Sequence, residues 1–367
     1  MKISIVRRKL RLSPRNSCIF SADVLIYDYR MYSPQFSITN KILKYTGTIE
    51  AAKELIENAP LVPAWEAKFR EEAIVRTVHH GTHIEGNELN FTEAEKVLAG
   101  AQIVGRERDI QEVLNYRNVL KFIENFQAPE ITEETIKHMH SLITDRIMPE
   151  ETCGEYRKSQ VVVKNSQTGE ITFRPPPSVE IPYLISDFLV WANSMKPEEM
   201  HPAMKAGIVH YEVVRVHPFL DGNGRVARAV ATLSLFRDGY DIKRFFSLEE
   251  YYDREPMQYY DALQSVAKLE GNMTYWLEYF IEGLAIELTR IKEKVKSLST
   301  DLKIKRSMGG IVEFIQENSF LQNKAFFELF PTISEDTVLR EIKDLINKGI
   351  VQKTGSTKGV RYVLRTQ

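Results

Sequence analysis

Residues 217–228 constrain the fold of this chain more than any other segment. They read His-Pro-Phe-Leu-Asp-Gly-Asn-Gly-Arg-Val-Ala-Arg, and apolar residues recur at helical spacing before and after them. Because proline disfavours helical backbone in the residue before it, Pro218 should leave His217 extended and end the first helix near Val216. The segment is therefore predicted to be a loop between two helices, with Phe219 pointing inward to pin that loop to the core.

The turn at residues 221–224 has the composition of an anion-binding site. Its sequence Asp-Gly-Asn-Gly opens the second helix, whose first backbone N–H groups lack helical partners and attract anions. The two glycines allow a phosphate group to approach the backbone closely. Arg225 and Arg228 are three residues apart, hence on one helix face, and a guanidinium group matches phosphate oxygens. Because a cation opposes the dipole in the first turn of a helix, these arginines suit phosphate binding better than a structural role.

Two other side chains of the segment can act on a bound polyphosphate. His217 titrates near neutral pH and can accept the proton of a hydroxyl group. Asp221 is an oxygen ligand, and Mg²⁺ commonly binds one carboxylate together with phosphate oxygens. The combination predicts a nucleotide-transfer site. Two alternatives are a structural loop with surface arginines and a dinucleotide-binding turn over residues 222–227, which would need βαβ flanks rather than helices.

These twelve residues resemble the signature of the Fic family, His-x-Phe-x-(Asp/Glu)-Gly-Asn-Gly-Arg-x-x-Arg, at every fixed position. The resemblance implies a protein adenylyltransferase, which transfers AMP from ATP to a Ser, Thr or Tyr hydroxyl of a target protein and releases pyrophosphate. It implies that His217 deprotonates that hydroxyl and that Asp221 holds Mg²⁺. The remaining residues would bind ATP, at the α-phosphate through Gly222, Asn223 and Gly224 and at the β- and γ-phosphates through Arg225 and Arg228.

Residues 82–87, Thr-His-Ile-Glu-Gly-Asn, resemble the inhibitory helix of the same family, (Ser/Thr)-x-x-x-Glu-(Gly/Asn). The resemblance implies that Glu85 pairs with Arg228 and takes the γ-phosphate position, since a carboxylate competes with phosphate for one guanidinium. The chain departs from the pattern, because Gly81 stands four residues before Glu85 and the hydroxyl is one place late, on Thr82. In some relatives the same Glu supports removal of AMP by water. An ordinary surface Glu at a helix end is the remaining alternative.

Two β-rich runs, 161–163 and 171–174, flank a Gly-containing turn and predict a hairpin that ends at the prolines 175–177. In the family such a hairpin covers the site and aligns the target by strand pairing, which needs a free edge. We expect the edge that contacts the target near Ile171, Thr172 and Phe173.

Tyr259 and Tyr260 fall in a helical run after the motif. They resemble the tyrosine pair that lines the adenine pocket in relatives, and an aromatic face suits a purine ring. A place in the hydrophobic core is the alternative.

Composition excludes several classes of protein. The chain has 367 residues and is 43% hydrophobic, enough for two or three domains with cores. A net charge of −1 gives no general attraction to nucleic acid or lipid. The two cysteines, Cys18 and Cys153, fit a reducing cytosol rather than a disulfide framework. No apolar run approaches the roughly 20 residues that span a membrane. We therefore expect a cytoplasmic protein without a membrane partner.

The expected fold is mostly α, in four parts. Residues 1–38 form a peripheral extension of unassigned role. Residues 39–126 form a helical region that carries Glu85, with a capping box at Thr92 and Glu95 opening one of its helices. Residues 127–297 form a Fic-type helical core with its β-hairpin flap and the helices that follow. Residues 298–367 are predicted to form two helices followed by a β-hairpin, an order that resembles a small α+β winged helix-turn-helix.

The winged-helix resemblance supports a second hypothesis, a DNA-binding regulator whose Fic core senses nucleotide. DNA contacts would come from Arg340, Lys343, Lys358 and Arg361. Residues 301–367 carry 11 Lys+Arg against 8 Asp+Glu, a modest excess that does not favour DNA over protein docking or a homodimer. A third hypothesis is another reaction at the same site: UMP transfer, phosphotransfer or de-AMPylation. Self-modification is expected as one form of the main activity.

Overall fold

The computed structural model describes residues 32–364 except positions 60, 62, 165–168, 170, 331–332, 348 and 356–359. Cys18, most of the N-terminal extension, the predicted turn of the flap except Gly169, and Lys358 lie outside the described residues. Within the described part, no helix is long and apolar enough to cross a bilayer.

The N-terminal helices are α1 (Asn40–Glu57), α2 (Pro63–His83), α3 (Phe91–Leu98) and α4 (Glu107–Glu124). The predicted capping box is wrong by two residues. The Asn90 side chain accepts a hydrogen bond from the Glu93 backbone N–H, and the Glu93 carboxylate accepts one from the Asn90 backbone N–H. Asparagine is a stronger N-cap than threonine, so α3 begins two residues before the box at Thr92 would start it.

The central elements are α5 (Glu133–Thr144), β1 (Val163–Lys164), β2 (Ile171–Phe173), α6 (Ile181–Ser194), α7 (Pro202–Val216) and α8 (Asn223–Arg237). They are followed by α9 (Leu248–Arg254), α10 (Pro256–Lys268) and α11 (Thr274–Asn318). Short 3₁₀ turns lie at Glu150–Thr152, Ser178–Glu180, Ile242–Arg244 and Asn323–Ala325. The strands β1 and β2 are antiparallel, with Val163 opposite Phe173, and they confirm a hairpin between the predicted runs.

Helices α7 and α8 pack against each other at the centre of the molecule, and most residues of both are buried. One apolar cluster joins α7 to α1, α10 and α11, and a second joins α7 and α8 to α4, α5 and α6. Gly207 on α7 allows α11 to approach, because an added Cβ there would lie 3.0 Å from Leu277 and 3.2 Å from Phe280. The loop between α7 and α8 therefore connects two helices that are packed tightly into the core.

Residues 32–38 are not peripheral, in contrast to the prediction for the whole extension. The Met273 backbone N–H donates to Gln35 O at 2.7 Å, and the Ser37 N–H donates to Thr274 Oγ1 at 2.9 Å. The Tyr32 ring packs edge-on against Trp191. This segment is thus bound to the start of α11 and to α6. Its sequence has no helical or strand periodicity, so these contacts could not be predicted from it.

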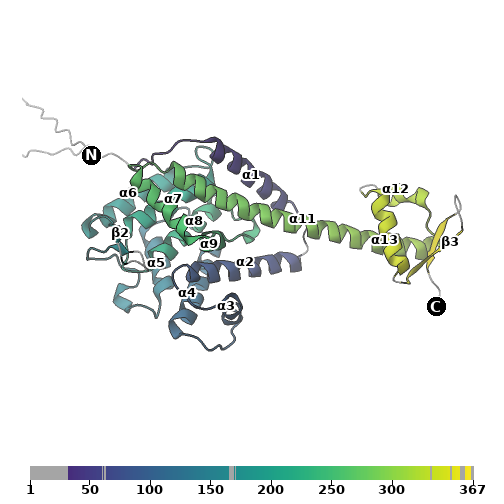
Figure 1. Ribbon diagram of the computed structural model, residues 1–367, viewed down its shortest axis with the longest axis horizontal. Coiled ribbons are helices and arrows are strands. Elements are labelled where there is room, and N and C mark those ends of the chain that lie inside the picture. Colours follow the sequence, from purple (N-terminus) through teal and green to yellow (C-terminus); the bar gives the residue numbers. More distant parts are fainter. Residues whose placement is uncertain are drawn as a thin grey trace, which may run out of the picture.

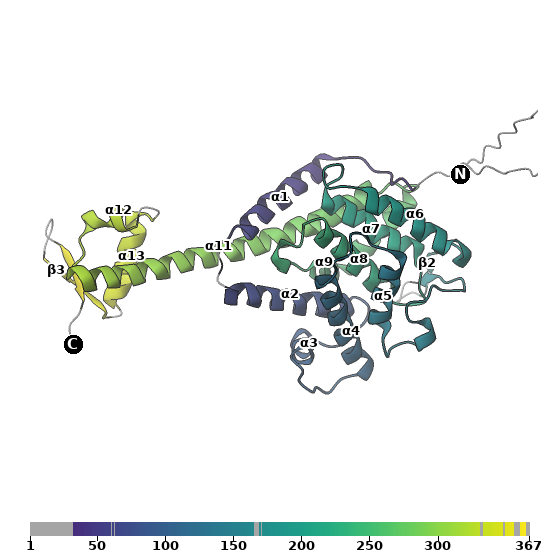
Figure 2. The same cartoon turned by 180° about the vertical axis from the view of Figure 1, so that it is seen from behind.

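Helix α11 is a single helix of 45 residues that passes through the predicted boundary at residue 298. Figures 1 and 2 show it projecting from the helical body and carrying the C-terminal unit. That unit contains α12 (Phe326–Leu329), α13 (Glu335–Asn347) and the antiparallel pair β3 (Val351–Thr354) and β4 (Arg361–Leu364). Its separate core includes Ile311 and Ile315 from the end of α11. The predicted helix–helix–hairpin order is present, and Arg340 and Lys343 are exposed on α13. A DNA contact for these residues stays a prediction.

Candidate active site

His217 follows the last residue of α7 and has left-handed backbone, with φ 49° and ψ 61°. The expectation of extended backbone is wrong, although α7 ends at Val216 as predicted. Left-handed backbone also avoids the right-handed helical conformation that proline disfavours, and it lets the His217 N–H still donate to Val213 O at 3.0 Å. The residue thus closes the final turn of α7 and redirects the chain.

The imidazole of His217 is held in one tautomer. Its Nδ1 lies 3.2 Å from Val214 O, and a carbonyl can only accept, so Nδ1 carries the proton and Nε2 keeps its lone pair. Burial lowers the pKa of His217, and the positive charge of Arg157 acts in the same direction, while the Val214 contact offsets part of the effect. The ring is therefore a neutral proton acceptor at pH 7.

The loop after His217 is closed by Phe219 and Asn223. Phe219 is fully buried, as predicted, and stacks on the His140 ring at a centroid distance of 3.8 Å. The Phe219 backbone N–H donates to Asn223 Oδ1, and Asn223 Nδ2 donates to Phe219 O, both at 2.9 Å. The polar atoms of the Asn223 side chain are thus engaged in shaping the loop, so a phosphate contact from this residue is left to its backbone N–H.

His140 fixes the backbone of Asp221 and leaves its carboxylate accessible. The Gly154 N–H donates to His140 Nδ1 at 2.8 Å, so Nε2 carries the proton and donates to Asp221 O at 3.1 Å. Burial lowers the pKa of His140 to about 4, which keeps this bridge neutral. The Asp221 side chain is 51% exposed, and its Oδ2 lies 3.4 Å from Arg108 Nη2.

Glu85 lies against Arg228 at the N-terminus of α8. Arg228 Nη2 donates to Glu85 Oε1 at 2.7 Å and to Gly81 O at 2.9 Å. Burial alone would lower the pKa of Arg228, but Glu85 and the neighbouring tyrosines raise it well above its usual value. A Cβ added at Gly224 would overlap Glu85 Oε1, so only glycine leaves room for an anion there.

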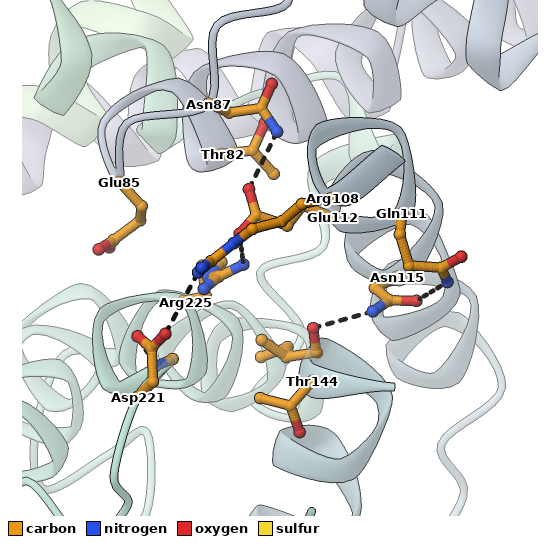
Figure 3. A network of polar contacts seen from close by, with 12 residues as sticks. Thr82, Glu85, Asn87, Arg108, Gln111, Glu112, Asn115, Thr144, Asp221 and Arg225 are labelled. Carbon is orange, nitrogen blue, oxygen red and sulfur yellow. Dashed lines mark hydrogen bonds and ion pairs between the residues drawn. The ribbon is translucent and has the colours of Figure 1, made fainter. Parts of the chain in front are cut away.

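Arg225 is paired with a carboxylate that sequence analysis did not find. Figure 3 shows Glu112 of α4 beside it, with 3.2 Å between Arg225 Nη1 and Glu112 Oε1. The other oxygen of Glu112 accepts from Asn87 Nδ2 at 3.0 Å, and Arg108 bridges Glu112 and Asp221. A recognisable signal was present, because polar residues three apart fall on the buried face of α4: Asp109, Glu112 and Asn115.

The two motif arginines retain unused donors. Both guanidinium groups are almost fully buried, at 3% exposure for Arg225 and 2% for Arg228. The Nε atoms of both residues, and Nη1 of Arg228, make no hydrogen bond within the described residues. Because a buried donor without a partner is costly, these groups fit an anion that carries several oxygens.

The predicted tyrosine pair is split by the fold. Tyr259 is 1% exposed, and its hydroxyl bonds His210 Nε2 at 2.9 Å, so this ring belongs to the core. Tyr260 is 39% exposed, and its ring lies 5.1 Å from that of Tyr259. The core alternative thus describes the packing of Tyr259, and a contact of either ring with adenine stays a prediction.

The flap presents an accessible edge beside this site. Ile171 is 44% exposed and Thr172 is exposed, while Phe173 is half-buried. In the described part of the chain, β1 and β2 form a two-stranded sheet, so the far edge of β2 has no partner strand in it. Such an edge is suited to pairing with an extended segment of another protein.

Mg²⁺ fits Asp221 only as a partner of phosphate. Among the described residues, no group of three or more His, Cys, Asp or Glu side chains could hold a metal ion. Asp221 is a single, accessible carboxylate beside the N-terminus of α8, which matches the usual coordination of Mg²⁺ by one carboxylate, substrate phosphates and water.

Gly81 stands where the inhibitory pattern has a hydroxyl residue, and the Tyr116 ring explains why. A Cβ at Gly81 would overlap Tyr116 Cε1 and lie 3.1 Å from Glu249 Cγ. Replacing Gly81 by Ala is therefore expected to destabilise the fold by about 1–3 kcal/mol, measured as a lower Tm by calorimetry.

The control is Gly47→Ala on α1, where an added Cβ meets nothing within 4 Å. Alanine is favoured over glycine in a helix by about 1 kcal/mol, so this variant should be at least as stable as the parent. Equal changes in Tm for the two variants would show that the contact of Gly81 with Tyr116 is unimportant.

Comparison with known proteins agrees with this geometry. Residues 130–235 match the sequence profile of the Fic/DOC family. A protein adenylyltransferase Fic from Drosophila grimshawi is 33% identical over 177 residues, which are 47% of this chain and 35% of that relative. A relative from Drosophila ananassae is 33% identical over the same share of this chain and 34% of its own length. The chain thus spans about a third of the length of the curated relatives it matches.

Solved structures show the same fold. The crystal structure of a Fic family protein from Desulfovibrio desulfuricans superposes with a TM-score of 0.62 at 23% identity, covering 92% of this chain and 99% of that one. Fic-1 from C. elegans superposes with a TM-score of 0.57 at 24% identity, covering 71% and 73% of the two chains. The family match includes residues 217–228 and leaves Glu85 and the C-terminal unit outside it.

Proposed function

We propose, since residues 130–235 form a Fic/DOC family domain, that this protein transfers AMP from ATP to a hydroxyl side chain of a target protein. One observation carries the proposal: a neutral imidazole with a free Nε2 follows α7, and the loop after it leads to two buried arginines with unused donors. Names given to relatives agree with it, since those named above are protein adenylyltransferases.

In the proposed reaction the residues hold the nucleotide and move one proton. The N-terminal N–H groups of α8, with Gly222 and Gly224, would bind the α-phosphate, and Arg225 and Arg228 would bind the β- and γ-phosphates. His217 Nε2 would take the proton of the target hydroxyl as its oxygen attacks the α-phosphorus and pyrophosphate leaves. Mg²⁺ held by Asp221 would neutralise part of the phosphate charge.

The same geometry supports restraint by Glu85. Its carboxylate binds the Arg228 guanidinium and fills the space above Gly224, where the terminal phosphate of ATP would bind. We expect the target segment to pair with the edge of β2 at Ile171, Thr172 and Phe173, and Tyr260 to contact adenine.

Labelled nucleotides test the function. Glu85→Gly protein, incubated with Mg²⁺ and a cell lysate, should transfer label from α-labelled ATP and should add no γ label beyond that which the lysate transfers without it. Mass spectrometry should find the mass of AMP on a Ser, Thr or Tyr of the labelled protein, including this chain itself if it modifies itself. Transfer of γ label above that of the lysate alone would indicate phosphotransfer instead, and no added transfer of either label would refute the proposal.

A further inference from the structure

Arg157 lies just before the flap, and its guanidinium group is enclosed by backbone carbonyl groups. The residue is 2% exposed, and no ion pair among the described residues includes it. Its Nε donates to His217 O at 2.8 Å and its Nη2 to Val216 O at 3.5 Å. Its own backbone N–H donates to Pro218 O at 2.9 Å. Arg157 therefore binds three consecutive backbone carbonyl groups, those of residues 216–218.

The same guanidinium also binds both ends of the flap. Nη1 donates to Ser159 O at 3.1 Å, before β1, and Nη2 donates to Pro176 O at 2.6 Å, after β2. Gln160 adds a bond across the same base, from its Nε2 to Pro175 O at 2.8 Å. The hairpin is therefore closed at its base by the group that holds the end of α7.

The surroundings explain how a buried cation is tolerated there. The last carbonyl groups of a helix carry partial negative charge and lack helical partners, so the end of α7 favours a cation. A planar group with five N–H donors can serve several carbonyls at once, which a lysine ammonium group cannot do with the same geometry. Burial without a carboxylate lowers the pKa of Arg157, which indicates that the carbonyl cage is its main stabilisation.

We infer that Arg157 is a positioning residue. Its guanidinium group holds both the proton acceptor His217 and the flap, so that a target segment on β2 meets His217 Nε2 at a fixed distance. The inference rests on the proposed function and names the part of the chain that sets its geometry. Left-handed backbone at His217 is uncommon for a residue with a side chain, so the contacts to His217 O and Pro218 O are needed to hold it.

The first test needs no target protein. The His217 imidazole is titrated by NMR in the parent protein, in Arg157→Gln and in Arg157→Lys. Removing the positive charge in Arg157→Gln should raise the His217 pKa, because that charge disfavours the imidazolium form. Arg157→Lys keeps the charge and should leave the pKa near that of the parent. An unchanged titration together with unchanged His217 ring and backbone resonances in a folded Arg157→Gln protein would overturn the inference.

The second test separates positioning from nucleotide binding. In the Glu85→Gly background, Arg157→Lys should reduce AMP transfer from ATP onto the chain or a labelled target by about 10²-fold, the usual effect of a misplacement near 1 Å. The Kd for ATP should not change, since Arg157 touches none of the residues assigned to the phosphates. Arg70→Gln, at an exposed arginine of α2 that pairs with Glu66 away from the site, is the control and should transfer at the rate of the Glu85→Gly background.

The outcomes distinguish the inference from the function. If Arg157→Gln fails to fold, Arg157→Lys carries the test, and parent-level transfer by a folded Arg157→Lys protein would refute the positioning role. If the Glu85→Gly parent transfers no AMP, the proposed function fails, whereas the NMR titration still decides whether Arg157 acts on His217.

Discussion

Replacing Glu85 by glycine should raise the affinity for MgATP by about 10- to 150-fold, the equivalent of one hydrogen bond to a charged group at about 1.5–3 kcal/mol. The substitution would remove the hydrogen bond from Arg228 Nη2 and would clear the space above Gly224 that the carboxylate fills. Because a phosphate group would take over both, the nucleotide would no longer compete with the chain's own anion. Isothermal titration calorimetry measures the change directly.

The same substitution should act on stability in the opposite direction when nucleotide is absent. Arg228 is 2% exposed, so without Glu85 its buried charge loses its directly bonded carboxylate and keeps the Gly81 carbonyl and the attraction of the buried Glu249 carboxylate. We expect a loss of about 1–3 kcal/mol and a lower Tm, restored by ATP because a ligand stabilises the state that binds it.

Two variants control for the Glu85 result. Glu85→Gln keeps the size and removes the charge, so its affinity for ATP should fall between those of the parent and Glu85→Gly. Glu88→Gln removes a carboxylate that is 72% exposed and pairs with Arg106 rather than with Arg228, and its affinity should equal that of the parent. An unchanged affinity in Glu85→Gly would contradict the competition between Glu85 and phosphate.

The central loop could be predicted because its signals are local. The end of α7 at Val216, the start of α8 at Asn223 and the inward position of Phe219 all follow from proline, glycine and apolar spacing within a few residues. The backbone of His217 could not be predicted in the same way. Extended and left-handed conformations both satisfy the following proline, and the choice depends on Arg157, which is distant in sequence.

The ion-pair partners of the loop could not be predicted from the sequence, for a similar reason. Glu112 and Arg108 reach Arg225 and Asp221 only because α4 packs beside α8, and charge alone gives no register between two helices. The position of Tyr259 was undecided because aromatic residues at helical spacing suit a core and a ligand pocket equally. Its hydroxyl contact with His210 places it in the core.

The long helix α11 shows a different limit. The predicted boundary at residue 298 follows a charged stretch at 287–296, yet charged residues are good helix formers, and Glu293, Lys294 and Lys296 lie on an exposed face of the continuing helix. The helix instead ends at Asn318, with left-handed backbone at Ser319. No proline lies between Thr274 and Asn318, and this was the available signal that the helix continues.

Replacing His217 by alanine should lower the rate of AMP transfer in the Glu85→Gly background by about 10²–10⁴-fold, the usual contribution of a general base. The Kd for ATP should stay near that of the background protein, because the imidazole contacts Val214 O rather than the residues assigned to the phosphates. The pH profile gives an independent check: the base must be neutral, and its pKa lies below the usual 6.5, so transfer should be constant near pH 7 and fall as the pH drops through that pKa. His138→Ala, at an exposed histidine on α5, should change neither the rate nor the profile. Transfer by His217→Ala at the rate of the background protein would remove His217 from the chemistry.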